Sequence, residues 1–132
     1  MSGINLWAVL VAAVSSFVLG GLWYSPAVFL KAWNRAGGLP EIPEKMQHPG
    51  RVFGVAFAFA LISAWVFAWW LGPDPQLRDA LLKGLVAGAG LVGASFGINY
   101  QFASRRFLMW AIDAGYHTAQ FVLFALVLSL WP

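Results

Sequence analysis

The chain has 132 residues, of which 61% are hydrophobic and only 10% charged, and its mean hydropathy is +0.73. Soluble domains carry about a quarter charged residues, so the composition excludes a soluble protein and predicts an all-α integral membrane protein. The net charge of +3 does not indicate nucleic-acid binding, because the charges are few and confined to the predicted loops. The absence of cysteine excludes disulfides, thiolate catalysis and cysteine metal sites.

The first predicted span covers residues 4–24, since about 20 apolar residues suffice to cross the hydrocarbon. No Lys or Arg precedes it, so we expect a retained span rather than a cleaved signal peptide. Small residues recur at every fourth position and predict close helix packing. They are Ala8, Ala12, Ser16 and Gly20. Trp23 and Tyr24, at the end of the span, are typical of interfacial aromatic anchors.

A short amphipathic helix is predicted over residues 26–36. Ser25 is expected to be its N-cap and Pro26 its first residue. Trp33 belongs to its apolar side. The polar side carries Lys31, Asn34 and Arg35. This pattern is typical of a helix that lies in the headgroup plane.

Two further spans are predicted over residues 52–71 and 78–99. The first of these has alanine at every fourth position from Ala56 to Ala68. The next helix is expected to begin with Asp74 as its N-cap and Pro75 as its first residue. Small residues form two stripes on that helix, one of Gly84 and Gly88 and one of Ala89, Gly93 and Gly97. Small stripes on every span predict a tight bundle.

The fourth predicted span, residues 106–131, carries polar side chains along one face. At about 100° per residue they fall within roughly 60° of one another. They are Arg106, Asp113, His117 and Gln120. Small residues lie on the opposite face, at Ala111, Gly115 and Ala119. We expect this helix to lie inside the bundle with its polar face inward.

The distribution of basic residues predicts the orientation of the spans. The first and third loops hold Lys31, Arg35, Lys45, Arg51, Arg105 and Arg106, whereas the second loop region holds only Arg78 and Lys83. Residues 1–132 are therefore predicted to form one four-span membrane domain with both termini periplasmic and the first and third loops cytoplasmic.

Two runs of residues are similar to the motifs of a known family. Leu22-Trp23-Tyr24-Ser25-Pro26 follows the first span, and Asp113-Ala114-Gly115-Tyr116 lies in the fourth. With Asn99-Tyr100, they resemble the opening and closing motifs of a bacterial family of small four-helix inner-membrane proteins, catalogued as a domain of unknown function. The resemblance covers nearly the whole chain and carries over no residue beyond Tyr116. It implies a four-span fold and a bacterial inner membrane, and it implies no activity.

Asp113 is the residue around which a site is expected. It lies roughly 10 Å along the helix from Arg106, and an ionisable residue at that depth is by default a functional hypothesis. Its expected partners are His117, Asn99 and Arg106, or a tyrosine hydroxyl if the acid is neutral. The candidate ligand-binding or proton-coupling residues are Asp113, His117, Asn99, Tyr116, Tyr24, Trp23, Arg106 and Gln120.

A structural role for Asp113 is the alternative interpretation. The carboxylate would then join the fourth span to the corner between Trp23 and Pro26, accepting hydrogen bonds from free backbone N–H groups or from Trp23. His117 taken alone is more often a packing residue than a ligand, and Asn99 is more often a helix-end cap. Arg106 is typical of a contact to lipid phosphates.

Three classes of function stay open at the level of sequence. The first is a homo-oligomer that binds or moves a small or amphipathic ligand through the polar cytoplasmic-side cluster, with proton coupling through Asp113. The second is a non-catalytic scaffold or accessory protein. An enzyme comes third, because the serines have no evident partner base and Asp113 with His117 supplies only two metal ligands. No cofactor is indicated, and the expected partners are membrane lipids and further copies of the chain; the sequence identifies no soluble partner.

Overall fold

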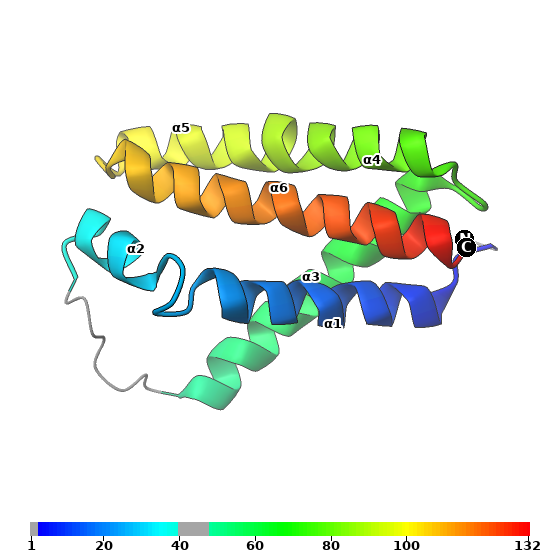
Figure 1. The fold of residues 1–132 in the computed structure, drawn as a ribbon, viewed down its shortest axis with the longest axis horizontal. Coiled ribbons are helices and arrows are strands. Elements are labelled where there is room, and N and C mark those ends of the chain that lie inside the picture. Colours follow the sequence, from blue (N-terminus) through cyan, green and yellow to red (C-terminus); the bar gives the residue numbers. More distant parts are fainter. Residues whose placement is uncertain (1–2, 40–47) are drawn as a thin grey trace.

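The computed structural model describes residues 3–39 and 48–132, and in these ranges the chain forms helices and no strand. Four helices are long and apolar enough to cross a membrane (Figure 1). They are α1 (Leu6–Trp23), α3 (Pro49–Leu71), the continuous helix formed by α4 (Leu77–Leu85), η1 (Val86–Gly93) and α5 (Ala94–Phe102), and α6 (Phe107–Leu130). The predicted all-α, four-span architecture is therefore confirmed.

The two helix starts predicted at prolines are wrong. The short helix α2 (Leu30–Ala36) begins at Leu30, because the carbonyl of Ser25 accepts hydrogen bonds from the N–H groups of Val28 and Leu30 and the chain forms turns between them. The Ser25 hydroxyl donates backwards, to the carbonyl of Leu22 at 2.7 Å, instead of capping a helix. The serine thus closes the end of α1.

The start of α4 also lies later than expected. Its N-cap position falls at Gln76, while Asp74 adopts a left-handed conformation with φ +53°. A residue before proline is disfavoured in the helical region, so Asp74, followed by Pro75, belongs to the turn. The loop that contains Lys45, which we expected on the basic side, lies outside the described residues.

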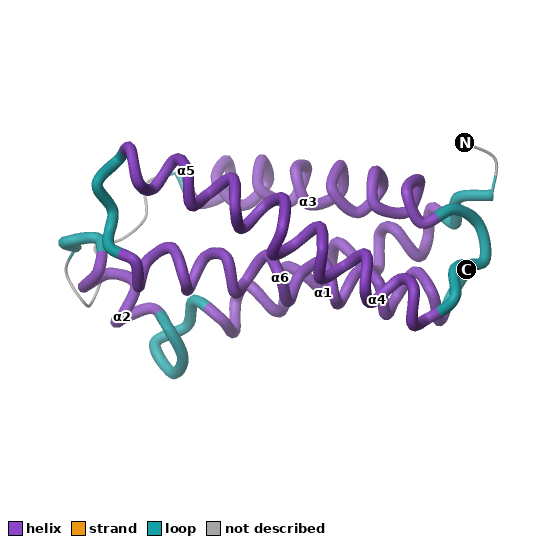
Figure 2. Tube along the Cα trace, turned by 90° about the horizontal axis from the view of Figure 1, so that it is seen from above, coloured by secondary structure: helices purple, strands orange, loops and turns teal. Residues whose placement is uncertain are grey.

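The helices are arranged around α6. In Figure 1, α6 lies between α1 and the continuous helix α4–η1–α5, and α3 crosses behind them obliquely. Helix α6 contacts every other helix of the described chain. Both termini and the loop before α4 lie at one end, whereas α2 and the turn between α5 and α6 lie at the other; Figure 2 shows the same arrangement from above. The expected inside position of the fourth span is confirmed.

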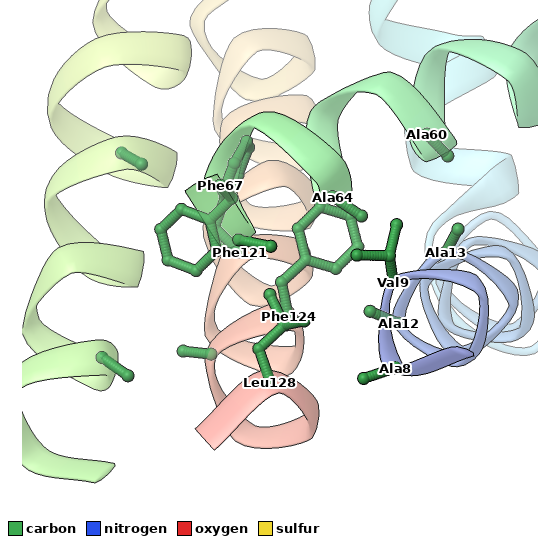
Figure 3. Packing of buried hydrophobic residues seen from close by; sticks show 14 residues of the cluster. Ala8, Val9, Ala12, Ala13, Ala60, Ala64, Phe67, Phe121, Phe124 and Leu128 are labelled. Carbon is green, nitrogen blue, oxygen red and sulfur yellow. The ribbon is translucent and has the colours of Figure 1, made fainter. Parts of the chain in front are cut away.

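The core combines small residues of α1 and α3 with phenylalanine rings of α6. Ala12 and Ala64 are fully buried, as is Phe124. Figure 3 shows the Phe124 ring pointing toward Ala64 and α1, with Phe67 of α3 beside Phe121. The ring centroids of Phe67 and Phe121 lie 5.4 Å apart, edge to face. The stripe of small residues on α1 therefore packs as predicted, and Ala60, Ala64 and Ala68 do the same on α3.

A π-helix aligns the glycines of the third span along α6. Cβ atoms built on Gly84 and Gly88 would lie 2.8 Å from the carbonyl oxygen of Phe121 and 2.5 Å from the Cα of Thr118, respectively. Gly93 faces Ala114, and Gly97 faces Trp110, whose indole N–H donates to the carbonyl of Gly93 at 2.8 Å. A regular α-helix would place Gly84/Gly88 and Gly93/Gly97 on different faces. The wider turns of η1, with their i→i+5 hydrogen bonds, unite the two predicted stripes into one contact surface.

Helix α3 buries side chains mainly in its second half, whereas its first half contacts α1 through the rings of Phe53 and Phe57, which lie edge to face against Phe17. Ala60, Ala64, Phe67 and Ala68 are buried, whereas nearly all residues from 51 to 59 are exposed, Ala56 among them. The oblique course of α3 in Figure 1 carries its first half away from α6. This divergence leaves space beside the middle of α6.

Candidate functional site

The carboxylate of Asp113 accepts three hydrogen bonds from three different segments. The Tyr24 hydroxyl, just after α1, donates to Oδ1, and the Tyr100 hydroxyl of α5 donates to Oδ2. The indole Nε1 of Trp33, in α2, also donates to Oδ2, at 3.1 Å. Asp113 is buried, with only 7% of its surface exposed. These four residues, which we call the Asp113 cluster, join the ends of α1, α2 and α5 to α6.

The donors of the Asp113 cluster match the chemistry of a carboxylate. An indole N–H only donates, and an ionised carboxylate only accepts, so Trp33 and Asp113 form a complementary pair. Burial and then the hydrogen bond to Asp113 raise the pKa of the Tyr24 hydroxyl, which therefore keeps its proton and stays a donor. Three neutral side chains therefore donate to the acid.

The side chains of Trp23 and Tyr116 donate hydrogen bonds to backbone carbonyls near the Asp113 cluster. The indole of Trp23 donates to the carbonyl of Ile112 at 3.0 Å, one residue before the aspartate, and not to the carboxylate as the structural interpretation had it. Its ring packs against Gly115, on the face of α6 that carries small residues, where a built Cβ would lie 3.1 Å from it. The Tyr116 hydroxyl donates to the carbonyl of Ser16 at 3.1 Å.

Two of the expected partners of Asp113 lie elsewhere. Asn99 and Arg106 are exposed, and no hydrogen bond or ion pair of the described residues joins either of them to Asp113. The π-helix is the reason for the first error, since it rotates the end of the third span so that Tyr100, and not Asn99, faces α6. Arg106 stands at the N-cap position of α6, ahead of the buried part of the helix.

The sequence pattern places Trp33 on the apolar side of the short helix and does not predict that its indole N–H donates to Asp113. Asn34 was predicted on the polar, outer side and is in fact buried, with 2% of its surface exposed. The physical reason is that α2 packs against α6, where a Cβ on Gly37 would lie 3.1 Å from the end of Met109. Lys31 and Arg35 are exposed, as expected.

His117 and Gln120 form a second polar group, separate from Asp113. The Nδ1 atom of His117 lies 2.8 Å from the Oε1 atom of Gln120. The imidazole packs between two aromatic rings, with centroids 5.0 Å from those of Phe96 and of Tyr116. His117 therefore pairs with Gln120 and is not a hydrogen-bond partner of the carboxylate.

The pair lines a pocket of about 370 Å³ beside the diverging half of α3. The other lining residues come from α1, α3, η1 and α6, and they are Phe17, Ala56, Phe59, Ala60, Ser63, Val92, Tyr116 and Phe121. Ala56 and Phe59 are exposed, so the pocket opens at the outer surface of the helices. For a chain that spans the membrane with these helices, that surface faces lipid.

A neighbouring pocket extends this space along α3. It measures about 410 Å³, shares Ser63, Val92 and Phe121 with the first pocket, and reaches Trp69 and Trp70 near the end of α3. We call the two together the lateral groove. The groove is mostly apolar, and His117 and Gln120 are the polar pair at its base. Within the described ranges, no three His, Asp or Glu side chains are grouped so that they could hold a metal ion.

The fold and these two sites define a small, all-α, four-span membrane protein. A family model described as "Protein of unknown function (DUF1761)" matches residues 7–129, and the chain belongs to this family. The resemblance to a family of unknown function is thereby confirmed. No curated protein and no solved structure matches the chain.

Proposed function

We propose that this protein binds a small amphipathic molecule from the bilayer in the lateral groove, with its polar head at His117 and Gln120. The observation that carries the proposal is an apolar pocket of about 370 Å³ with a polar pair at its base. Ligand sites are typically concave, apolar and of several hundred Å³, with a few polar groups that orient the ligand. The proposal keeps the ligand class expected from the sequence and moves the polar contact from Asp113 to the next turn.

The Asp113 cluster has a different part in this proposal. Its carboxylate oxygens already accept hydrogen bonds from Tyr24, Trp33 and Tyr100, and the residue is buried, so little of the carboxylate is open to a ligand. We therefore assign Asp113 the role of fixing the ends of three segments against α6. That anchor supports a groove whose walls come from the same helices.

The surroundings of the protein are part of the same proposal. We place it in a bacterial inner membrane with the Asp113 cluster toward the cytoplasm, supported by the excess of basic residues in the two loops at that end. We also infer that lipids and further copies of the chain cover the outer helix faces. Two exposed glycines, Gly54 of α3 and Gly90 of η1, would meet no atom within 4 Å of a built Cβ and leave room for a close neighbour.

Two tryptophan substitutions on α3 test the ligand site. Ala56 lines the groove and Ala58 does not, although both are exposed on the same helix. Purified protein in vesicles of phosphatidylethanolamine and phosphatidylglycerol is titrated with palmitic acid, methyl palmitate, hexadecanol and hexadecyltrimethylammonium. We expect saturable binding of at least one of them by the wild type and by Ala58→Trp. Ala56→Trp should weaken that binding by about tenfold or more, because the indole fills the pocket.

Two outcomes of this titration would contradict the proposed ligand site. If none of these amphiphiles binds saturably to the wild type, the groove is not a ligand site. If Ala56→Trp binds as tightly as Ala58→Trp, the amphiphile lies elsewhere. Melting curves of both variants in the same vesicles show whether either substitution has disturbed the fold.

A non-catalytic scaffold or accessory protein is the second candidate function. It is favoured by the three hydrogen bonds to the Asp113 carboxylate, which join three segments of the fold to α6. In this case Asp113→Asn lowers stability and removes no separable activity, and the groove binds no amphiphile saturably.

A further inference from the structure

The hydrogen bond between His117 and Gln120 determines what the pair offers to a ligand. In a neutral imidazole one ring nitrogen donates and the other accepts. Because Oε1 of Gln120 accepts, Nδ1 of His117 carries the proton, and Nε2 is left as an acceptor. The amide nitrogen of Gln120 keeps its N–H donors. The pair therefore presents one acceptor and one donor nitrogen.

Both of these nitrogens are free for a ligand. Neither Nε2 of His117 nor the amide nitrogen of Gln120 has a hydrogen-bond partner among the described residues. No fully buried side-chain nitrogen or oxygen of the described chain lacks a partner. Both nitrogens are therefore accessible, and both residues line the pocket of about 370 Å³.

The depth of the pair restricts the charge of the head group. His117 lies ten residues after Phe107, the start of α6, which is about 15 Å along the axis. That places it near the middle of a hydrocarbon core of about 30 Å. Among residues 3–39 and 48–132, no Asp, Glu, Lys or Arg lines the pocket. A charged head group would thus lie near the bilayer midplane without a counter-charge, which is costly.

We propose that the lateral groove selects amphiphiles with an uncharged carboxyl head group. The carboxyl O–H donates to Nε2 of His117, and the carbonyl oxygen accepts from the amide N–H of Gln120. The aliphatic tail follows the groove past Ser63 and Val92 toward Trp70. The inference rests on the proposed ligand site and deepens it by naming the head group.

Other head groups match the pair less well. A methyl ester has the acceptor and lacks the donor, so it leaves Nε2 of His117 desolvated and unpaired. A buried polar group without a partner costs about 1–3 kcal/mol. A quaternary ammonium head has neither a donor nor an acceptor, and it carries a charge. In this series, the carboxylic acid is the head group that offers a donor to Nε2 of His117 and, on a different oxygen, an acceptor to the amide nitrogen of Gln120.

Palmitic acid and methyl palmitate, compared in the same vesicles, test the inference. The measurement is made at about pH 7, above the ordinary imidazole pKa of about 6.5, so that Nε2 of His117 can accept, while desolvation in the bilayer raises the carboxyl pKa and keeps part of the acid protonated. We expect the wild type to bind the acid at least about fivefold more tightly than the ester. In His117→Phe and Gln120→Met, which keep the bulk of each side chain, the acid should lose this advantage while ester binding changes less than about twofold.

The two levels of the proposal fail differently. Equal affinity of the wild type for acid and ester overturns the head-group inference, and saturable binding blocked by Ala56→Trp would still support the groove. The absence of saturable binding by any amphiphile overturns the groove itself. If neither variant folds, the comparison of acid and ester on the wild type alone decides, because it requires no substitution.

Discussion

Asp113 illustrates, at the scale of single residues, how a membrane helix can hold an acid with neutral partners. Two phenol hydroxyls and one indole N–H donate to its two oxygens. Each donor comes from an aromatic side chain whose ring also packs, as Tyr24 does against Trp33 and Tyr116. Removing the acceptor should therefore affect the junction of four segments at once.

The substitution Asp113→Asn is expected to destabilise the protein by about 1–3 kcal/mol, because an amide offers one acceptor oxygen where the carboxylate offered two. Trp33 and Tyr100 both donate to Oδ2, so the amide oxygen is expected there, and the N–H₂ group then replaces Oδ1, where the Tyr24 hydroxyl loses its acceptor and has to turn. The measurement is thermal unfolding in detergent, followed by tryptophan fluorescence.

Asp79→Asn is the matched control for this prediction. Asp79 is an exposed acid in the first turn of α4, outside any hydrogen bond of the Asp113 cluster. Surface substitutions of this kind change stability by less than about 0.5 kcal/mol in most cases. If the two variants unfold at the same temperature, the three hydrogen bonds do not hold the junction.

The sequence predicts that Asp113 is buried and that it lies near Trp23 and Tyr24, but it does not predict all of the hydrogen-bond partners of Asp113. A buried acid in an apolar span is evident from hydropathy, and Trp23 and Tyr24 were placed at that end of the bundle correctly. Trp33 could have been found from its position, since an indole on the inner side of a helix near a buried acid needs an acceptor. Tyr100 could not have been found from helical periodicity.

Among the helices, the π-helix η1 explains why Tyr100 was not predicted as a partner of Asp113. With a regular period, the face that starts at Gly84 and Gly88 continues to Ser95 and Asn99 at about 100° per residue. The extra residue taken in by η1 moves the contact face onward to Tyr100. The existence and approximate ends of the spans follow from hydropathy alone, whereas their phase depends on backbone packing against α6.

Gly88 is where the third span packs most tightly against α6. A Cβ there would lie 2.5 Å from the Cα of Thr118, a backbone atom that cannot move without shifting α6. We expect Gly88→Ala to destabilise the protein by about 1–3 kcal/mol through overpacking, measured by thermal unfolding in detergent.

Gly90→Ala is the control in the same π-helix. A Cβ at Gly90 meets nothing within 4 Å, and alanine is favoured over glycine inside a helix by roughly 0.5–1 kcal/mol. This variant should be as stable as the wild type or more so. Equal destabilisation by the two substitutions would mean that the helix itself, and not its contact with α6, is sensitive to side chains.

At the scale of the whole molecule, the fold separates the loops into two groups. The turn between α5 and α6 and the helix α2 lie at one end, and the loop before α4 lies at the other with both termini (Figure 1). Arg105 and Arg106 belong to the first end and Arg78 to the second. The positive-inside rule assigns the more basic end to the cytoplasm, and this proposed orientation also places the Asp113 cluster there.

The absence of cysteine makes the orientation directly measurable. Gln101 and Gln76 are exposed, at opposite ends of the third span. In bacterial cells with a permeabilised outer membrane and an intact inner membrane, a maleimide that cannot cross the inner membrane should label Gln76→Cys. It should not label Gln101→Cys until the inner membrane is also broken. The reverse pattern would invert the orientation, because the helices fix the two positions on opposite sides, and the Asp113 cluster would then face the periplasm.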